Sequence, residues 1–162
     1  MKDEMGNLEK LKLEYSKFEK KYPLPNFNKL NEFFDVEEIE VESDFLLRKI
    51  RRLISERVTG YARFVDIILN PSNAPMFFFK LIKKLDNKDK ESLSEVYEIL
   101  GKLEVEILTL DLEYSEKNEA EFIIKCTNLF ENNVKNKFLE IVKKMNGIEN
   151  NSKKENGASY FG

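Results

Sequence analysis

The chain has 162 residues and a net charge of -3, a length that allows one domain with a sizeable core and is short for two. Charged residues make up 35% of it and apolar residues 41%, which is typical of a folded protein with a strongly charged surface. The chain has no histidine and one cysteine, Cys126, which excludes zinc sites and Cys–His catalytic pairs.

Apolar residues at helical spacing predict a first long helix over residues 4–22. They recur in steps of three and four: Leu8, Leu11, Tyr15, Phe18 and Tyr22. A pair of prolines ends this helix, and a short Phe-rich helix follows, built on Phe27, Leu30, Phe33 and Phe34. Asp35 with Glu38 resembles a capping box that opens another helix, and a short extended segment in EIEVES is the alternative.

A second long helix is predicted over residues 43–69. Its apolar face consists of Leu46, Ile50, Leu53, Ile54, Tyr61, Phe64, Val65 and Ile68. The run NPSNAP ends it, because proline cannot continue a helix and Asn and Ser favour turns. The segment MFFFKLIKKL then predicts a second short Phe-rich helix, with Pro75 at its first position. Three consecutive phenylalanines cover most of its circumference, so we expect it to be nearly enclosed.

Two further long helices are predicted over residues 88–114 and 116–145. The first carries a heptad seam of Leu93, Val96, Leu100, Leu103, Ile107, Leu110 and Tyr114, although LEVEILTLDLEY also alternates like a strand. The second follows a different phase, through Ala120, Ile123, Thr127, Phe130, Val134, Phe138, Ile141 and Met145. This phase change predicts a turn near Ser115, with Ser115 as the helix cap, and two antiparallel helices.

The predicted fold class is therefore all-α: an antiparallel bundle of four long helices with two short Phe-rich capping helices. We expect a single domain over residues 1–145. Residues 146–162 have few apolar groups and no periodicity, which predicts a flexible polar tail.

Charge is unevenly distributed along the chain. Residues 45–85 carry nine basic and two acidic groups, a net charge of +7, and contain all five arginines. Residues 86–114 carry three basic and nine acidic groups, a net charge of -6. The acidic helices could neutralise the basic one within the chain, or the arginines could remain open to an acidic partner or to phosphates.

On a helical wheel, Arg48, Arg52 and Arg63 lie opposite the apolar stripe, and Arg51 flanks them. We therefore expect an outward partner-binding face of Arg48, Arg51, Arg52 and Arg63. Its expected partner is an acidic protein surface or a second copy of the chain, as in a homodimer. Nucleic-acid binding through the same face is the alternative, without a helix-turn-helix, zinc-finger or RNP-like signature to support it.

Arg57 falls at the centre of the predicted apolar stripe and so needs a partner. We predict a buried polar network of Arg57 with Glu104, Asp111 and Glu131. An internal pocket for a small anion is one alternative, and a carboxylate metal site that includes Glu98 is another. A third is that Arg57 is exposed at the surface because the helical wheel is misplaced.

An enzyme of this composition would depend on carboxylates, Lys, Tyr or Ser. Helical nucleotide hydrolases bind Mg²⁺ with paired E-x-x-E and E-x-x-D motifs. Glu95 with Glu98 and Glu37 with Glu40 give the first spacing, but the second motif is missing. A magnesium-dependent hydrolase is therefore a third hypothesis, after a non-enzymatic interaction or regulatory module and a nucleic-acid-binding protein. No catalytic residue, metal ligand or cofactor is predicted for the leading hypothesis.

The compartment follows from the single cysteine and the hydropathy. One cysteine cannot form an internal disulfide, which favours the reducing cytoplasm. No apolar run approaches the roughly 18 residues of a membrane-spanning helix, and the first residues are charged, so we expect no membrane association. Abundant Lys, Asn, Ile and Glu suggest a prokaryotic or phage genome rich in A and T.

Overall fold

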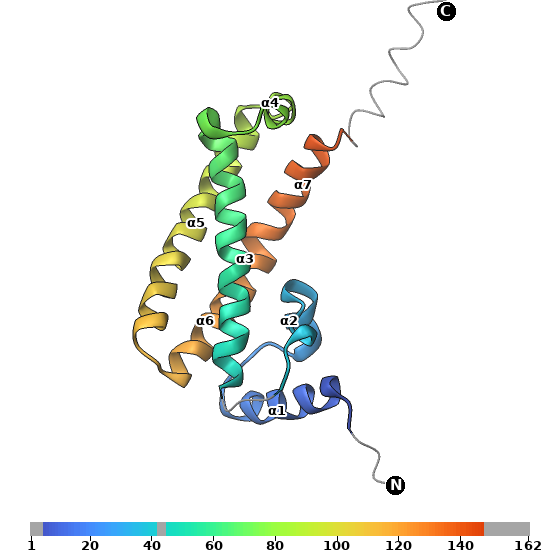
Figure 1. The fold of residues 1–162 in the computed structure, drawn as a ribbon, viewed down its shortest axis with the longest axis vertical. Coiled ribbons are helices and arrows are strands. Elements are labelled where there is room, and N and C mark those ends of the chain that lie inside the picture. Colours follow the sequence, from blue (N-terminus) through green and yellow to red (C-terminus); the bar gives the residue numbers. More distant parts are fainter. Residues whose placement is uncertain (1–4, 42–44, 148–162) are drawn as a thin grey trace, which may run out of the picture. The chain divides into compact units, whose positions relative to one another are not determined.

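The computed structural model describes residues 5–41 and 45–147, and these are all-helical, with no strand (Figure 1). The α-helices are α1 (Asn7–Lys21), α2 (Phe27–Phe34), α3 (Leu46–Leu69), α4 (Met76–Ile82), α5 (Asn87–Leu112), α6 (Glu116–Leu129) and α7 (Lys135–Met145). Short 3₁₀ turns cover Val36–Glu38 and Pro71–Asn73, and a π-helical turn covers Phe130–Val134. The all-α prediction is confirmed for this part of the chain. The tail predicted over 146–162 lies outside the described residues from 148 onward.

The helix boundaries follow local capping chemistry. Ser115 caps α6, because its side chain accepts a hydrogen bond from the backbone N–H of Asn118 at 3.3 Å. The turn predicted near Ser115 is therefore present. At the start of α5, Asp86 and Asp89 exchange hydrogen bonds between each carboxylate and the other's backbone N–H, both at 2.9 Å.

Two predicted features of the helices differ in the structure. The expected capping box at Asp35 is absent, because Asp35 ends α2 in the left-handed region with φ 52° and is followed by a 3₁₀ turn. The helix expected over 116–145 is interrupted by the π turn Phe130–Val134, which separates α6 from α7. A π turn places extra backbone in one turn of helix, so it shifts the face that the following residues present.

The chain divides into two compact units. Unit 1 comprises the described residues within 1–60 and 102–130, and unit 2 comprises those within 61–101 and 131–147. The chain passes from one unit to the other at Gly60, at Gly101 and at the start of the π turn. Glycine lowers the stability of a helix, and a π turn interrupts its regular hydrogen bonds. A single domain over 1–145 stays a prediction.

The core of unit 1 is formed by α1, α2, the first part of α3, the second part of α5, and α6. Its fully buried apolar side chains include Leu11, Leu30, Phe34, Val36, Ile50, Ile54 and Ile123. Tyr15 is also fully buried, and its hydroxyl donates a 2.5 Å hydrogen bond to the carbonyl of Pro25, which connects α1 to the segment before α2. The rings of Phe34 and Phe130 meet edge to face at 5.2 Å.

The core of unit 2 contains Val65, Ile68, Leu93, Val96, Leu100, Ile141 and Met145. The ring of Phe138 contacts Tyr61 and Phe64 at centroid distances of 5.2 and 6.1 Å. The enclosure expected for the second Phe-rich helix is wrong: α4 buries Ile82, but it leaves Met76 and Phe77 exposed.

Candidate functional site

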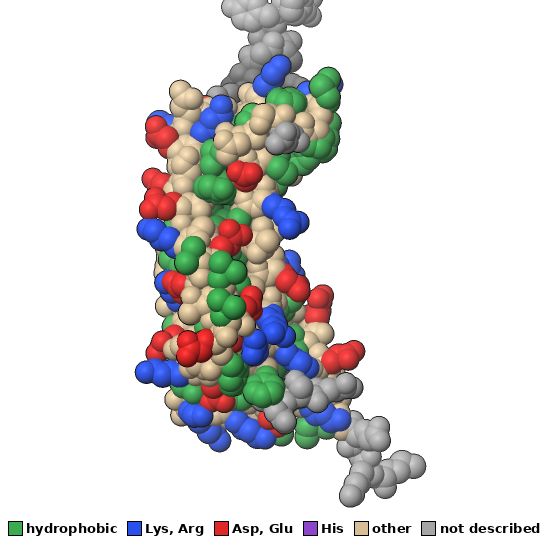
Figure 2. Space-filling view, turned by 60° about the vertical axis from the view of Figure 1, so that its left-hand side comes forward, with side chains coloured by type: hydrophobic (Ala, Val, Ile, Leu, Met, Phe, Trp, Pro, Cys, Tyr) green, Lys and Arg blue, Asp and Glu red, His purple; other side chains and the backbone are tan. Residues whose placement is uncertain are grey.

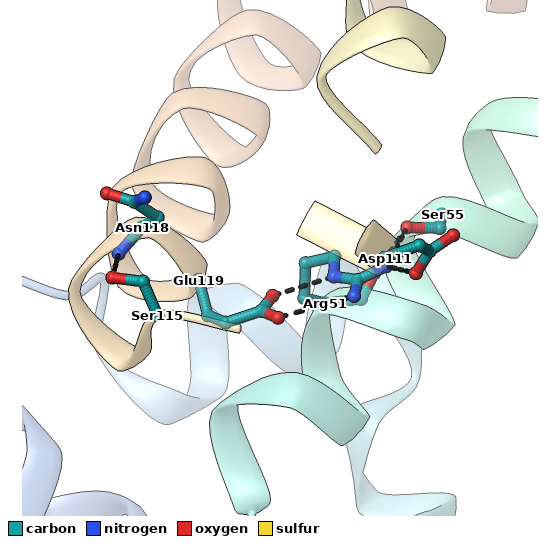
Figure 3. A network of polar contacts seen from close by, with 6 residues as sticks. All are labelled: Arg51, Ser55, Asp111, Ser115, Asn118 and Glu119. Carbon is teal, nitrogen blue, oxygen red and sulfur yellow. Dashed lines mark hydrogen bonds and ion pairs between the residues drawn. The ribbon is translucent and has the colours of Figure 1, made fainter. Parts of the chain in front are cut away.

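A guanidinium group lies in the middle of unit 1. Arg51 of α3 is 0% exposed and is held by carboxylates from two other helices (Figure 3). Its Nε donates to Glu119 Oε2 at 2.6 Å, and Nη2 donates to Glu119 Oε1 at 3.3 Å. Nη1 donates to Asp111 Oδ1 at 2.7 Å. The two carboxylates differ in environment, because Glu119 is fully buried whereas the Asp111 side chain is 48% exposed.

Each member of this network is placed by its own helix. Arg51 lies on the buried side of α3, next to Ile50 and three residues before Ile54. Glu119 lies in the first turns of α6, one turn before the buried Ile123. Asp111 is in the last turn of α5. The planar guanidinium has donors on several edges, so one arginine can bond both carboxylates where a lysine could not match the geometry.

The electrostatics of the network keep Arg51 charged. Burial lowers the pKa of the guanidinium, but its hydrogen bonds to Glu119 and Asp111 outweigh this and raise the pKa above its ordinary value. A fully buried ion pair with satisfied donors offers no reactive group to a substrate. The arrangement therefore serves the packing of α3, α5 and α6 in unit 1.

This placement corrects two expectations about arginines. Arg51 was expected on the outward face, but it is the buried one. Arg57 was expected in the core, but it is half-buried and pairs with Asp35 at 2.7 Å. Of the three carboxylates predicted for a buried network, Asp111 takes part, with Arg51. Glu104 is half-buried on α5, and Glu131 is exposed in the π turn.

Glu119 was missed by sequence reasoning, although a signal for it existed. Glu119, Phe122, Ile123 and Cys126 are spaced by three and four residues and are all buried. Glu119 and Ala120 lie four and three residues before Ile123, so the apolar stripe of α6 could have been continued back to either of them. Thr127, also buried, satisfies its hydroxyl by donating to the carbonyl of Ile123 at 2.8 Å.

The other three arginines have no ion pair with a described residue. Arg52 and Arg63 are exposed, and Arg63 belongs to unit 2 whereas Arg52 belongs to unit 1. The predicted four-arginine face therefore reduces, within unit 1, to Arg48 and Arg52, one helical turn apart on α3.

Arg48 stacks on an aromatic ring. Its guanidinium carbon lies 5.5 Å from the centroid of Tyr114, which is within the range of a cation–π contact. Its Nε is buried and has no hydrogen-bond partner among the described residues, an arrangement that is rare for a buried donor. The Tyr114 ring also meets Phe45 edge to face at 5.1 Å.

These residues form a mixed basic and aromatic surface. Phe45 is 51% exposed and Tyr114 is 43% exposed, and Arg52 extends the surface along α3. We name Phe45, Arg48, Arg52 and Tyr114 the Arg48–Tyr114 surface. In Figure 2, basic side chains gather in the lower half of the view, next to exposed hydrophobic ones.

Glu116, in the first turn of α6, lies two residues after Tyr114 in the sequence and has partners of its own. It accepts hydrogen bonds from Lys21 Nζ at 2.5 Å and from the Tyr22 hydroxyl at 2.8 Å. The bond from Lys21, followed by that from Tyr22, lowers the pKa of the Glu116 carboxyl below its ordinary value. Burial, together with the charges of Glu116 and Glu119, raises the pKa of Tyr114, so its hydroxyl stays protonated near neutral pH.

Metal-binding and nucleophilic side chains bear on the hypothesis of an enzyme. No group of three or more His, Cys, Asp or Glu side chains among them could hold a metal ion. Cys126 is buried, and burial raises the pKa of its thiol, which makes it a poor nucleophile. Glu95, from one E-x-x-E spacing, pairs with Lys137.

Unit 1 also has an open groove of about 340 Å³ between α5 and α6. Its lining residues are Glu106, Thr109, Leu110, Asn118, Glu121, Phe122 and Lys125. Lys125 and Glu106 pair with each other in the groove, so their charges already neutralise each other.

Two negative findings complete the description. Within residues 5–41 and 45–147, no helix combines the length and the apolar character that crossing a bilayer requires. Comparisons with protein-family models, with curated proteins and with solved structures give no match for this chain.

Proposed function

We propose that this chain is a non-enzymatic interaction module that binds an acidic protein segment through the Arg48–Tyr114 surface. One contrast carries the proposal. Arg51 and Arg57 are paired with carboxylates of their own chain, whereas Arg48 and Arg52 have no carboxylate partner among the described residues. The described carboxylates therefore leave these two cations without an ion pair.

The chemistry of the surface suits a protein partner. Arginine and tyrosine are the residue types that most often dominate the free energy of binding at protein interfaces. The contact between Arg48 and Tyr114 restrains the arginine before binding, which lowers the entropy that association costs. Phe45 adds apolar area that a purely phosphate-directed site would not need.

Several broader expectations belong to this proposal. The long helices are proposed to form an antiparallel bundle with α2 and α4 as its short capping helices, and the protein is proposed to act in the cytoplasm. Nucleic-acid binding through Arg48 and Arg52 is a competing outcome, which the following experiment separates from the first.

The test uses a fluorescein-labelled helical peptide rich in glutamate with leucine and phenylalanine on one face, and the full chain as the titrant. The measured quantity is the dissociation constant from fluorescence anisotropy. We expect Arg48→Glu with Arg52→Glu to weaken binding at least tenfold, because two attractive contacts become repulsive. The matched control is Arg63→Glu, an exposed arginine of the same helix in unit 2, which should change the affinity by less than about threefold.

Two outcomes would overturn the proposal. One is an affinity that the double charge reversal leaves unchanged. The other is no peptide binding together with retention of a single-stranded oligonucleotide whose affinity falls steeply with salt, which would favour the nucleic-acid alternative. Sedimentation equilibrium of the wild type and the double variant distinguishes a second copy of the chain from a foreign partner.

A further inference from the structure

Helix α4 exposes its most apolar residues. Met76 is 85% exposed, Phe77 is 60% exposed and Phe79 is 36% exposed. The opposite side of the helix attaches it to unit 2 through the buried Ile82 and the half-buried Phe78. The exposed fractions of Met76, Phe77 and Phe79 amount to roughly 400 Å² of side-chain surface, comparable to the largest apolar patch on an ordinary monomer.

One lysine lies on this helix and two follow its last residue, Ile82. Lys80, Lys83 and Lys84 are all exposed, and no acidic residue occurs between Asp66 and Asp86. At 100° per residue, Met76, Lys80 and Lys83 fall within about 60° of one another around the helix axis. Figure 2 shows hydrophobic and basic side chains together at the upper end of the view, where α4 lies in Figure 1.

We propose, against the sequence-based expectation of no membrane association, that α4 is an interfacial anchor that binds unit 2 to a lipid surface containing anionic headgroups. Met76 and Phe77 would enter the boundary between headgroups and acyl chains, while the lysines remain at the level of the phosphates. Amphipathic helices that lie in this boundary combine a Phe- or Leu-rich side with lysines and arginines. Stable attachment to a membrane needs two contributions, such as an apolar insertion and a basic patch. Here Met76 and Phe77 provide the apolar insertion, and the lysines provide the basic patch.

The lysines favour a lipid surface over a protein groove. Protein interfaces are enriched in Met and Phe but depleted in Lys, so an apolar patch with lysines on the same side suits a protein partner poorly. Each lysine near an anionic membrane, in contrast, contributes favourable free energy. Lys84 keeps one contact within unit 2, from Nζ to the carbonyl of Met145 at 3.0 Å, so Lys80 and Lys83 are the principal headgroup contacts.

This anchor is independent of the proposed peptide-binding function. The Arg48–Tyr114 surface belongs to unit 1, and α4 belongs to unit 2. Failure of either proposal therefore leaves the other standing.

The chain contains no tryptophan, so a substituted one reports on a single position. The Phe77→Trp variant of the full chain is titrated with vesicles of phosphatidylcholine containing about 30 mol% phosphatidylserine, and with vesicles of phosphatidylcholine alone. We expect a blue shift of the tryptophan emission with the anionic vesicles and a much smaller one with the neutral vesicles. Leu112→Trp is the matched control, since Leu112 is an 88% exposed apolar residue of unit 1, and its emission should not change.

Vesicle sedimentation then separates the two contributions. Lys80→Gln with Lys83→Gln should lower the partition coefficient roughly thirtyfold, the effect of removing two lysines near an anionic surface. Met76→Ser with Phe77→Ser should abolish the sedimentation of the chain with vesicles, without unfolding it, because both side chains are exposed.

Three outcomes would overturn the membrane proposal. The first is an absence of any emission shift or sedimentation with anionic vesicles. The second is equal sedimentation of the wild type and the Met76→Ser, Phe77→Ser variant. The third is a blue shift of Phe77→Trp that rises with protein concentration and needs no vesicle, which would indicate that a second copy covers α4 instead.

Discussion

The buried pair of Arg51 and Glu119 gives the sharpest test of the unit 1 core. We predict that Glu119→Leu lowers the free energy of unfolding by about 3–5 kcal/mol. Both side chains are essentially inaccessible to solvent, at 1% and 0%, so the substitution leaves a buried cation with Asp111 as its remaining carboxylate. About half of the Asp111 side chain faces water. Solvent therefore screens its attraction to Arg51, and Asp111 alone offsets only part of the free-energy cost of burying the guanidinium.

A double-mutant cycle separates the ion pair from general damage to packing. Arg51→Met alone leaves Glu119 buried without its partner and should cost about as much as Glu119→Leu. Arg51→Met combined with Glu119→Leu removes both charges, so the pair of substitutions should cost much less than the sum of the two single ones.

The measurement is equilibrium urea denaturation followed by far-UV circular dichroism. Glu121→Leu is the matched control, because Glu121 is an exposed glutamate of the same helix whose contact with Lys117 at 3.7 Å is also exposed. It should change the stability by less than about 0.5 kcal/mol. A cost below about 1 kcal/mol for Glu119→Leu, or strict additivity of the two single substitutions, would refute the reasoning.

Three further predictions concern other groups of the chain. The pKa of Glu116 is lowered by Lys21, so its ionised form stabilises the fold above the ordinary value of 4.5, and this contribution disappears as the pH falls through the folded-state pKa. The wild type should therefore lose more stability than Glu116→Gln in acid denaturation below that value, and parallel stability curves would contradict this. Tyr15→Phe leaves the carbonyl of Pro25 without its buried donor and should cost about 1 kcal/mol in urea denaturation, whereas an unchanged midpoint would show that the bond contributes nothing. Burial raises the pKa of the Cys126 thiol, so labelling by a thiol reagent should be slow in the native protein and fast in urea; rapid native labelling would disprove the burial.

The helices were readable from the sequence because their apolar spacing and their caps act locally. The 3–4 spacing before Pro23, the proline-containing run after α3 and the serine cap at Ser115 each set a boundary within a few residues of the one observed. The π turn was not readable, because it requires an extra residue in one turn and leaves the composition of the helix unchanged.

The roles of Arg51 and Arg57 were exchanged for a geometric reason. The stripe read from the sequence was weighted by Leu53 and Phe64, which are only half-buried, and it omitted Val58, which is fully buried. At 100° per residue, the observed buried side of α3 is rotated by about 50° from the predicted one. That rotation brings Arg51 into the core and moves Arg57 toward solvent, where Asp35 meets it.

The long reach of Arg51 has a consequence for how unit 1 assembles. Its carboxylates lie 60 and 68 residues further along the chain, so no segment near α3 in the sequence supplies them. Until Asp111 and Glu119 bind it, the Arg51 guanidinium must stay hydrated, because an unpaired charge in an apolar interior is strongly unfavourable. We therefore expect the core around Arg51 to lose its water in the same step in which α5 and α6 pack against α3.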